Sequence, residues 1–455
     1  MFNQYRVIHF VGIGGIGMSG IAEVLHNLGY EVTGSDLRES DTTTRLRNLG
    51  IKVFIGHDET NIDGAHVVVI SSAVSKTNPE VSAAGDRGIP VIPRAEMLAE
   101  LGRLKYGILI AGAHGKTTTT SMIATLLGEG GLDPTVVIGG KLKAMGSNAR
   151  LGQGEFLVAE ADESDGSFLM LSPTIAVITN IDREHMDYFR DIEHVKEAFL
   201  SFINKIPFYG VSIVCKENEH TREIIPRIKR RVITYGLSHD ADMYARNIRH
   251  EGPKTTFEAV FMGASLGVFT LPVPGVHNIL NSMAAILTAL QLQMPAEKIR
   301  SSLAGFSGIQ RRFEFRGEAK GVRVFDDYGH HPVEIRAVMK AAHECFAESR
   351  LMVIFQPHRY TRTRDLMDDF ALSFGAATRL YLMDIYAASE MPIEGINSET
   401  LLGRMKGLGI MNAVHISDRS GMIKKMLGEL SPGDVVLTLG AGDVYKMGEE
   451  ILKKL

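Results

Sequence analysis

The chain is poor in several features that would place it in particular protein classes. It has only two cysteines, Cys215 and Cys345, among 455 residues, so no disulfide framework is implied and a reducing compartment is the simpler interpretation. No apolar run reaches the roughly 18 residues that a membrane-spanning helix needs, and the amino terminus lacks a basic region followed by a cleavage site. We therefore expect a cytoplasmic protein without membrane insertion.

The chain also lacks a strong excess of positive charge. The formal net charge of −4 at pH 7 argues against a broad nucleic-acid-binding face, and we expect no nucleic-acid partner. The chain is rich in glycine, with 47 residues. Its hydrophobic content of 45% is enough for large cores. The length predicts about three domains.

Short β-rich runs followed by glycine turns and helical patterns recur along the chain in three series. This alternation is typical of parallel α/β sheets. We expect an α/β fold with a Rossmann-like domain at residues 1–103, a central P-loop domain at 104–315 and a doubly wound, Rossmann-like domain at 316–455. The strands that define the series are expected at 7–11, 31–33, 67–70, 106–111, 156–160, 175–179, 211–214, 322–325, 351–355, 380–384 and 435–439.

The first glycine-rich motif follows the first expected strand. Gly12, Gly14 and Gly17 form G-x-G-x-x-G, so backbone amides and a helix amino terminus could receive a diphosphate. Asp36 ends the second strand, where dinucleotide-binding folds often bind ribose hydroxyls. A site for NAD and a purely structural glycine turn therefore both remain open from this motif alone.

A second glycine-rich motif, Gly112–Thr117, stands between a strand and an apolar helical stretch, as a phosphate-binding loop requires. In such a loop Lys116 bridges the β and γ phosphates of ATP, and the Thr117 hydroxyl binds magnesium. Ile110 stands where the longest form of the pattern has its first glycine. We therefore interpret the motif as a shortened P-loop.

Acidic and histidine side chains follow the next two strands. Glu160–Asp165 contains four carboxylates, whose repulsion magnesium would offset. The alternative is an exposed acidic loop. Asn180–Tyr188, with Asp182, His185 and Asp187, adds metal-ligand or proton-handling groups at the same predicted sheet edge.

Two weaker patterns lie near the second predicted boundary. Gly275–Asn278 with Asn281 could present polar groups to a purine edge, although an ordinary N-capped helix explains it equally well. Arg311 and Arg312 could stabilise a transferring phosphoryl group, or they could be a surface pair.

Polar turns follow three strands of the third series, at Asp326–Pro332, Gln356–Arg362 and Asp384–Glu390. Pro332 disfavours helix at the residue before it. Arg359 and Arg362 are three residues apart, potentially on one helix face, and could hold carboxylates, although a solvated basic turn stays open for that segment alone. The convergence of three polar strand ends favours a binding site.

Seven motifs in this order resemble those of the Mur ligase family, and the resemblance spans the whole chain. They are Gly12–Gly17, Gly112–Thr118, Glu160–Asp165, Asp182–Tyr188, Gly275–Asn281, Asp326–Pro332 and His358–Thr363. The resemblance implies an ATP-dependent ligase that uses Mg²⁺ and joins L-alanine to UDP-N-acetylmuramate through an acyl phosphate. It implies that the first domain binds the UDP moiety, the second ATP and the third the amino acid. We expect a monomer or homodimer.

The resemblance also implies roles for individual residues. Those for catalysis are Lys116, His185, Arg312 and Asp327. Those for ATP are Gly112, Ala113, His114, Gly115, Lys116, Thr117, Thr118, His277, Asn281 and Arg312. Those for the UDP-sugar and the amino acid are Gly12, Gly14, Gly15, Gly17, Ser71, Ser72, Asp165, Tyr328, His330, Arg359 and Arg362. Those for the metal are Thr117, Glu160 and His185.

The sequence departs from the family pattern at two positions. Some related ligases carry a carbamylated lysine where this chain has Phe199, with Lys196 one turn earlier, so no carbamate is assumed. Ala113 replaces a hydroxyl residue that is common in the family's phosphate loop. Three alternatives remain: a family member that attaches a preformed murein peptide, an NAD-dependent oxidoreductase, and a nucleotide-sensing protein without chemistry.

Overall fold

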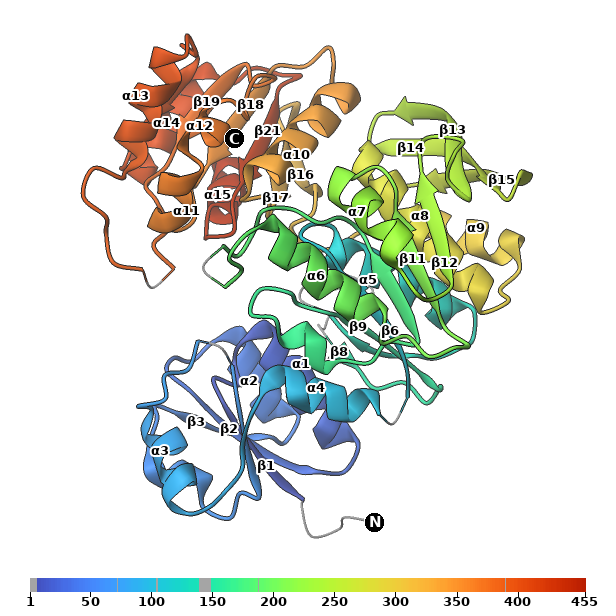
Figure 1. The fold of residues 1–455 in the computed structure, drawn as a ribbon. Coiled ribbons are helices and arrows are strands. Elements are labelled where there is room, and N and C mark those ends of the chain that lie inside the picture. Colours follow the sequence, from blue (N-terminus) through green and yellow to red (C-terminus); the bar gives the residue numbers. More distant parts are fainter. Residues whose placement is uncertain (1–5, 72, 104, 139–148, 187, 389) are drawn as a thin grey trace. The chain divides into compact units, whose positions relative to one another are not determined.

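The computed structural model describes residues 6–71, 73–103, 105–138, 149–186, 188–388 and 390–455 (Figure 1). The chain divides into two compact units. Unit 1 contains Met1–Arg246, Glu258–Phe269 and Leu280–Ser307, and unit 2 contains Asn247–Phe257, Thr270–Ile279 and Gly308–Leu455. Three sheets of five, ten and six strands carry the fold. The described residues include no helix that is both long enough and apolar enough to cross a membrane.

The first sheet is fully parallel and has the strand order β3-β2-β1-β4-β5. Ile8 and Phe10 belong to the core cluster that includes residues of α1, whereas Val11 packs with residues of α3, so helices cover both faces. The order reverses at β1, and the turn after β1 lies at the crevice where such sheets bind ligands. The elements are β1 Val7–Val11, α1 Ile16–Asn27, β2 Glu31–Asp36, α2 Asp41–Asn48, β3 Lys52–Ile55, η1 Glu59–Ile62, β4 Val67–Ile70, α3 Pro79–Asp86, β5 Val91–Pro93 and α4 Arg94–Gly102.

The second sheet has the order β15-β14-β13-β12-β11-β10-β6-β9-β7-β8. Its elements are β6 Tyr106–Ala111, α5 Lys116–Glu129, β7 Thr135–Val137, β8 Ala149–Arg150, β9 Phe156–Glu160, η2 Ser167–Met170, β10 Ile175–Ile178, α6 Ile192–Ile203, β11 Val211–Cys215, α7 Glu219–Ile224, η3 Ile225–Arg227, β12 Val232–Gly236, β13 Met243–Glu251, β14 Lys254–Phe261, β15 Ala264–Leu271, α8 Val276–Gln291 and α9 Ala296–Ala304. Parallel pairing places Ile110 opposite Glu160 and Ala111 opposite Ile178. The loops that follow β6, β9 and β10 therefore leave the sheet at one edge.

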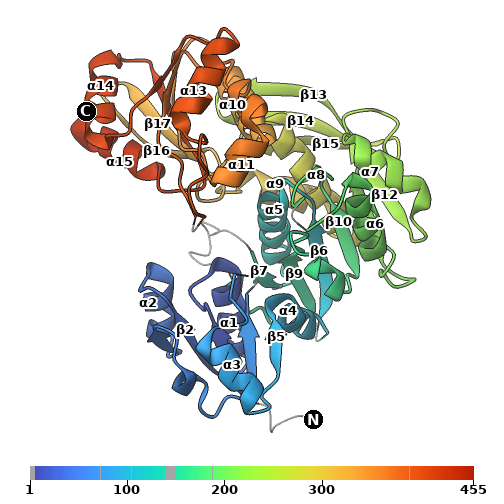
Figure 2. The same ribbon diagram turned by 60° about the vertical axis from the view of Figure 1, so that its left-hand side comes forward.

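The third sheet has the order β16-β17-β21-β18-β19-β20, and only its first strand is antiparallel to its neighbour. Helices α10 and α13 lie on one side of the sheet, and α14 and α15 lie on the other (Figure 2). Along β18, Leu351, Val353 and Phe355 belong to the core shared with α10 and α13, whereas Met352 and Ile354 pack with α14 and α15. This alternation is the period of two that a strand buried on both faces requires. The elements are β16 Glu314–Ala319, β17 Val322–Asp327, α10 Pro332–Cys345, β18 Leu351–Phe355, α11 Tyr360–Asp365, α12 Met367–Ala371, β19 Arg379–Leu382, α13 Ser398–Gly407, β20 Ala413–His415, α14 Arg419–Glu429, β21 Val435–Leu439 and α15 Tyr445–Lys454.

The predicted α/β class with parallel sheets is confirmed, and each predicted strand is present. Several strands are longer than predicted: β2 continues to Asp36 and β17 to Asp327. Two end earlier than predicted, since β10 ends at Ile178 rather than at residue 179, and β19 ends at Leu382 rather than at residue 384. The strands that were not predicted from the sequence are β3, β5, β7, β8, β12–β16 and β20.

Candidate active site

The glycine turn lies between β1 and α1, with Gly15 as the N-cap residue of α1. The amide of Gly14 donates a hydrogen bond to Oδ2 of Asp36 (2.9 Å), so Asp36 holds the turn in place. Ser71, directly after β4, lies beside the same turn, because its Oγ would be 3.8 Å from a Cβ placed on Gly12. Ser72 lies outside the described residues. The predicted diphosphate residues are thus brought together at the end of β1.

The phosphate loop connects β6 to α5, and Lys116, Thr117 and Thr118 form the first turn of that helix. Gly115 is the N-cap in a left-handed conformation (φ 83°), which favours glycine. The backbone of His114 exchanges two hydrogen bonds of 2.9 Å with the Asn180 side chain. Residues that follow β10 therefore fix the shape of the loop.

Lys116 is bound by a carboxylate. Its Nζ lies 2.9 Å and 3.0 Å from the two carboxylate oxygens of Glu163, which is only 3% exposed. Burial would lower the pKa of Lys116, but the charges of Glu163 and Asp162 outweigh it and raise that pKa. Lys116 is therefore positively charged, and its ammonium group already binds a carboxylate.

The acidic segment after β9 is not a plain solvated loop. Asp162 accepts a hydrogen bond from Nη2 of Arg94 (3.2 Å). Burial would raise the pKa of Asp162, yet Lys116 and Arg94 lower it to about 2. Asp165 accepts a hydrogen bond from the amide of Ser167 (3.0 Å) and so braces the turn into η2. Glu160 is the last residue of β9.

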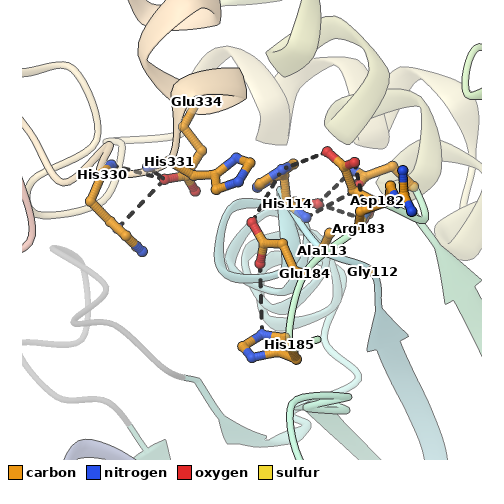
Figure 3. A network of polar contacts seen from close by, with 12 residues as sticks. Gly112, Ala113, His114, Asp182, Arg183, Glu184, His185, His330, His331 and Glu334 are labelled. Carbon is orange, nitrogen blue, oxygen red and sulfur yellow. Dashed lines mark hydrogen bonds and ion pairs between the residues drawn. The ribbon is translucent and has the colours of Figure 1, made fainter. Parts of the chain in front are cut away.

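Imidazoles and carboxylates meet beside the phosphate loop in unit 1. Nε2 of His114 lies 3.4 Å from Asp182 Oδ2 and 3.5 Å from Glu184 Oε1. The second oxygen of Glu184 is 3.6 Å from Nε2 of His185 (Figure 3). His185 has a positive φ of 57°, an uncommon conformation for histidine. Asp187 lies outside the described residues.

Asn281 supports the phosphate loop from α8. Its Oδ1 accepts a hydrogen bond from Thr119 Oγ1 (3.2 Å) and would be 2.6 Å from a Cβ on Gly115. In unit 2, burial and the charge of Arg312 lower the pKa of His277 to about 4, so this imidazole is neutral at pH 7. A neutral imidazole offers one donor and one acceptor, as a purine edge requires.

The two adjacent arginines of unit 2 differ in their surroundings. Arg311 donates to Asp326 Oδ2 (2.9 Å) and to the carbonyl of Gly442 (3.0 Å), so it ties β17 to the loop after β21. Nη1 of Arg312 lies 3.7 Å from Glu334 Oε1. Arg311 therefore has a structural role, and the prediction of a phosphoryl-binding guanidinium rests on Arg312.

Asp327 ends β17 and is 4% exposed. Its carboxylate accepts hydrogen bonds of 2.7 Å from the amides of Phe313 and Gly329. Burial raises the pKa of Asp327 to about 6, against the opposing effects of Arg312 and these amides.

Aromatic and histidine rings cluster in unit 2 after β17 and β18. His358 stacks on Tyr386 with ring centroids 5.5 Å apart, and Nη1 of Arg362 lies 3.3 Å from His358 Nδ1. The His330 ring packs edge-on against Tyr328, and its backbone amide donates to Glu334 (3.1 Å; Figure 3). Burial is the main cause that lowers the pKa of His330 to about 3 and that of His358 to about 4.

The expectation that Arg359 and Arg362 share a helix face is wrong. Arg359 is the N-cap residue of α11, with a φ of 73°, and its amide donates to the carbonyl of Tyr386 (2.8 Å). Arg359 thus pairs with the neighbouring strand end and precedes the helix, so only Arg362 lies on the helix. The turn at His331, by contrast, is confirmed, because α10 begins at Pro332.

Phe199, at the position of the carbamylated lysine in some related ligases, is part of the core. It is 1% exposed and its ring lies 5.3 Å from that of Phe168. Lys196 pairs with Glu193 (2.7 Å) and with Glu223.

Sequence reasoning missed several residues of these clusters. Arg94 carries no motif, and its position as the first residue of α4, directly after Pro93, was its only signal. Glu163 was predicted only as one of four carboxylates near magnesium, not as the partner of Lys116, and Asn180 lay inside a predicted segment without a role of its own. Tyr386 was within a predicted polar turn, and its aromatic ring was the available signal.

Comparison with models of protein families identifies the family to which the chain belongs. The model described as "Mur ligase family, catalytic domain" matches residues 7–106, the "Mur ligase middle domain" matches 110–289, and the "Mur ligase, glutamate ligase domain" matches 311–442. The chain belongs to the Mur ligase family. The family membership explains why a glycine turn of dinucleotide-binding type occurs beside a phosphate loop.

Individual Mur ligases match the chain over its full length. A UDP-N-acetylmuramate–L-alanine ligase of Geobacter sp. (strain M21) is 56% identical, covering 100% of this chain and 99% of that protein. The protein of the same name from Trichlorobacter lovleyi is also 56% identical, with 100% of both chains covered. The crystal structure of UDP-N-acetylmuramate-alanine ligase MurC from Thermotoga maritima has a TM-score of 0.84 at 28% identity, with 98% of each chain covered.

Proposed function

We propose that this Mur ligase is a UDP-N-acetylmuramate–L-alanine ligase that uses ATP and acts in peptidoglycan precursor synthesis. The full-length relatives at 56% identity carry that name. The observation that carries the chemistry is the contact of Lys116 with Glu163, because a phosphate loop whose lysine already holds an anionic group is built to receive phosphate. We assign UDP-sugar binding to residues 1–103, ATP binding to 104–315 and amino-acid binding to 316–455.

The phosphate loop and the acidic segment of unit 1 fit phosphate and magnesium, since glycine amides and Lys116 suit phosphate oxygens. In unit 2, the neutral His277 suits an adenine edge. The Thr117 hydroxyl and the Glu160 carboxylate are oxygen donors of the kind that Mg²⁺ prefers. His185 fits this cation less well, because imidazole suits softer metals, and its proposed role lies with the neighbouring Glu184 carboxylate. Magnesium, when bound, supplies neutralisation of the phosphate charges.

In the first step of the proposed reaction, the lactoyl carboxylate of the sugar nucleotide attacks the γ phosphorus of ATP, which forms an acyl phosphate and releases ADP. Two anions must therefore approach each other. Lys116 and Arg312 reduce their repulsion and stabilise negative charge on the transferring group. The amine of L-alanine then attacks the acyl phosphate, which releases phosphate and leaves an amide.

The amine must be neutral to attack. The pKa of Asp327 is raised to about 6, which is closer to the working pH than the pKa of an ordinary carboxylate. Asp327 is therefore our candidate for accepting a proton. Arg362 and the rings of Tyr328 and His330 are our candidates for holding the amino acid, because a guanidinium pairs with its carboxylate.

The test is phosphate release from ATP in the presence of UDP-N-acetylmuramate, with and without L-alanine, together with mass detection of the sugar nucleotide. We expect release that depends on both substrates and a product heavier by one alanyl residue. A product with a murein tripeptide but none with alanine would assign the chain to peptide attachment. ATP binding without product in either case would contradict a ligase.

A further inference from the structure

Arg94 lies between two loops that the proposed function assigns to different substrates. It is the first residue of α4, and its Nη2 donates to Asp162 Oδ2 over 3.2 Å. Its Nη1 lies only 2.2 Å from where a Cβ on Gly17 would be. The guanidinium therefore lies directly against the first turn of α1, in space that only a glycine leaves open.

This position is electrostatically unfavourable unless an anion is nearby. The amino end of α1 carries partial positive charge from its backbone amides, and its N-cap residue Gly15 has no side chain that could accept a hydrogen bond. A guanidinium at the same place adds a full positive charge. Asp162 offsets only part of this charge. It accepts one hydrogen bond from Arg94, and its own side chain is 41% exposed.

A cavity opens at this point. It has a volume of about 100 Å³ and is lined mostly by apolar residues, together with Gly17, Arg94, Glu160 and Asp162. It thus joins the glycine turn to the acidic segment that follows β9. An anion bound at the first turn of α1 meets the guanidinium of Arg94, which lies directly against that turn.

We propose that Arg94 is a substrate-binding residue whose guanidinium leaves Asp162 and binds the diphosphate of the incoming UDP-sugar. Asp162 holds Arg94 in place before the substrate arrives and competes with the diphosphate for it. The ligand class is a nucleoside diphosphate sugar, an identity that rests on the proposed function. The contact itself rests on the positions of Gly17, Arg94 and Asp162.

The competition gives the two partners opposite effects on binding. Arg94→Gln removes a charge-assisted contact, and the Kd for UDP-N-acetylmuramate is expected to rise about 10- to 100-fold. Asp162→Asn removes the competitor, and that Kd is expected to stay the same or fall. A pair that only braces the fold would instead weaken binding when either partner is lost.

The experiment is calorimetric titration of the full-length protein without ATP or magnesium, using UDP-N-acetylmuramate, UDP and UMP as the probes. Arg94→Lys should recover part of the affinity, and Arg94→Gln should weaken UDP more than UMP, because UMP lacks the second phosphate. Arg103→Gln, at an exposed arginine that follows the same helix, is the control. Thermal melting of each variant shows whether it is folded.

Equal weakening by Arg94→Gln and Asp162→Asn, or an Arg94→Gln variant that binds UDP-N-acetylmuramate as tightly as the parent, would overturn the proposal. These titrations measure binding alone. If UDP-N-acetylmuramate binds in an Arg94-dependent way but no alanyl product forms, the proposed function fails while Arg94 keeps its role. If an alanyl product forms but UDP-N-acetylmuramate binding does not depend on Arg94, the proposed function stands and the proposed role of Arg94 fails.

Discussion

Nζ of Lys116 and the carboxylate of Glu163 form an ion pair of 2.9 Å with little exposure to solvent. Lys116 begins α5, whereas Glu163 follows β9, and the parallel pairing of β6 with β9 brings the two together. The pair holds the phosphate loop and the acidic segment in one arrangement. Loss of one partner and loss of both partners should therefore have different consequences.

Lys116→Met should abolish most activity and also destabilise the protein. The cation that stabilises the transferring phosphoryl group is lost, for which we expect a fall in kcat of about 10²- to 10³-fold. Glu163 is left as a buried carboxylate without its lysine, which costs about 3–5 kcal/mol. Steady-state kinetics and urea unfolding measure the two effects separately.

The double variant Lys116→Met with Glu163→Gln separates these effects. It no longer buries an uncompensated charge, so most of the lost stability should return while activity stays low. If the double variant is as unstable as Lys116→Met alone, the ion pair is not the source of the destabilisation.

Asp327 should make the folded protein less stable as the pH rises from about 4 to 6. Its pKa is about 6 in the fold against an ordinary value of 3.8, so in this range the folded chain binds more protons than the unfolded chain. The stability that comes from this difference is fully present below pH 4 and is lost by about pH 6. The shift corresponds to about 3 kcal/mol.

Unfolding by urea at a series of pH values tests this. Asp327→Asn should flatten the decline between pH 4 and 6, although it also loses one hydrogen bond and is less stable at low pH. Glu318→Gln, at an exposed position on the same sheet, is the control and should keep the parent slope. An unchanged slope in Asp327→Asn would show that the raised pKa belongs to another group.

The sequence was sufficient for those parts of the fold and site that depend on local patterns. The strand that ends at Ala111, the glycine loop and the helix that begins at Lys116 are contiguous, so their order alone predicts a phosphate loop. Buried parallel strands such as Leu351–Phe355 are continuous apolar runs and are recognisable for the same reason.

The remaining features depend on contacts between distant segments. Glu163 reaches Lys116 only because Ile110 pairs with Glu160, a register that no local pattern contains. The strand Met243–Glu251 was missed because most of its side chains are exposed or half-exposed, and its polar residues do not form an apolar run. Arg359 was placed on a helix because spacing alone cannot reveal that its backbone has a positive φ and precedes the helix.

Activity should not depend on carbamylation of Lys196. Carbamate formation needs a neutral amine, and the hydrogen bonds to Glu193 and Glu223 raise the pKa of Lys196 and keep it protonated. We expect the rate to be unchanged by added bicarbonate, and Lys196→Met to keep at least half of it. An intact-mass increase of one carbon dioxide, with activity that follows bicarbonate, would contradict this prediction.

Arg362 should determine the affinity for the amino acid. It lies in α11, and its Nη1 is 3.3 Å from Nδ1 of His358, whose ring is stacked on Tyr386 and neutral at pH 7. Arg362→Ala should raise the KM for L-alanine about 10- to 100-fold, because a charge-assisted contact to the substrate carboxylate is lost. The KM for ATP should stay within about twofold.

Arg364→Ala is the matched control, since Arg364 lies two residues later, is half-exposed and pairs with Asp365. Equal effects of the two variants on the KM for L-alanine would mean that the helix contributes only diffuse positive charge, and an effect of Arg362→Ala on kcat alone would place the amino acid elsewhere.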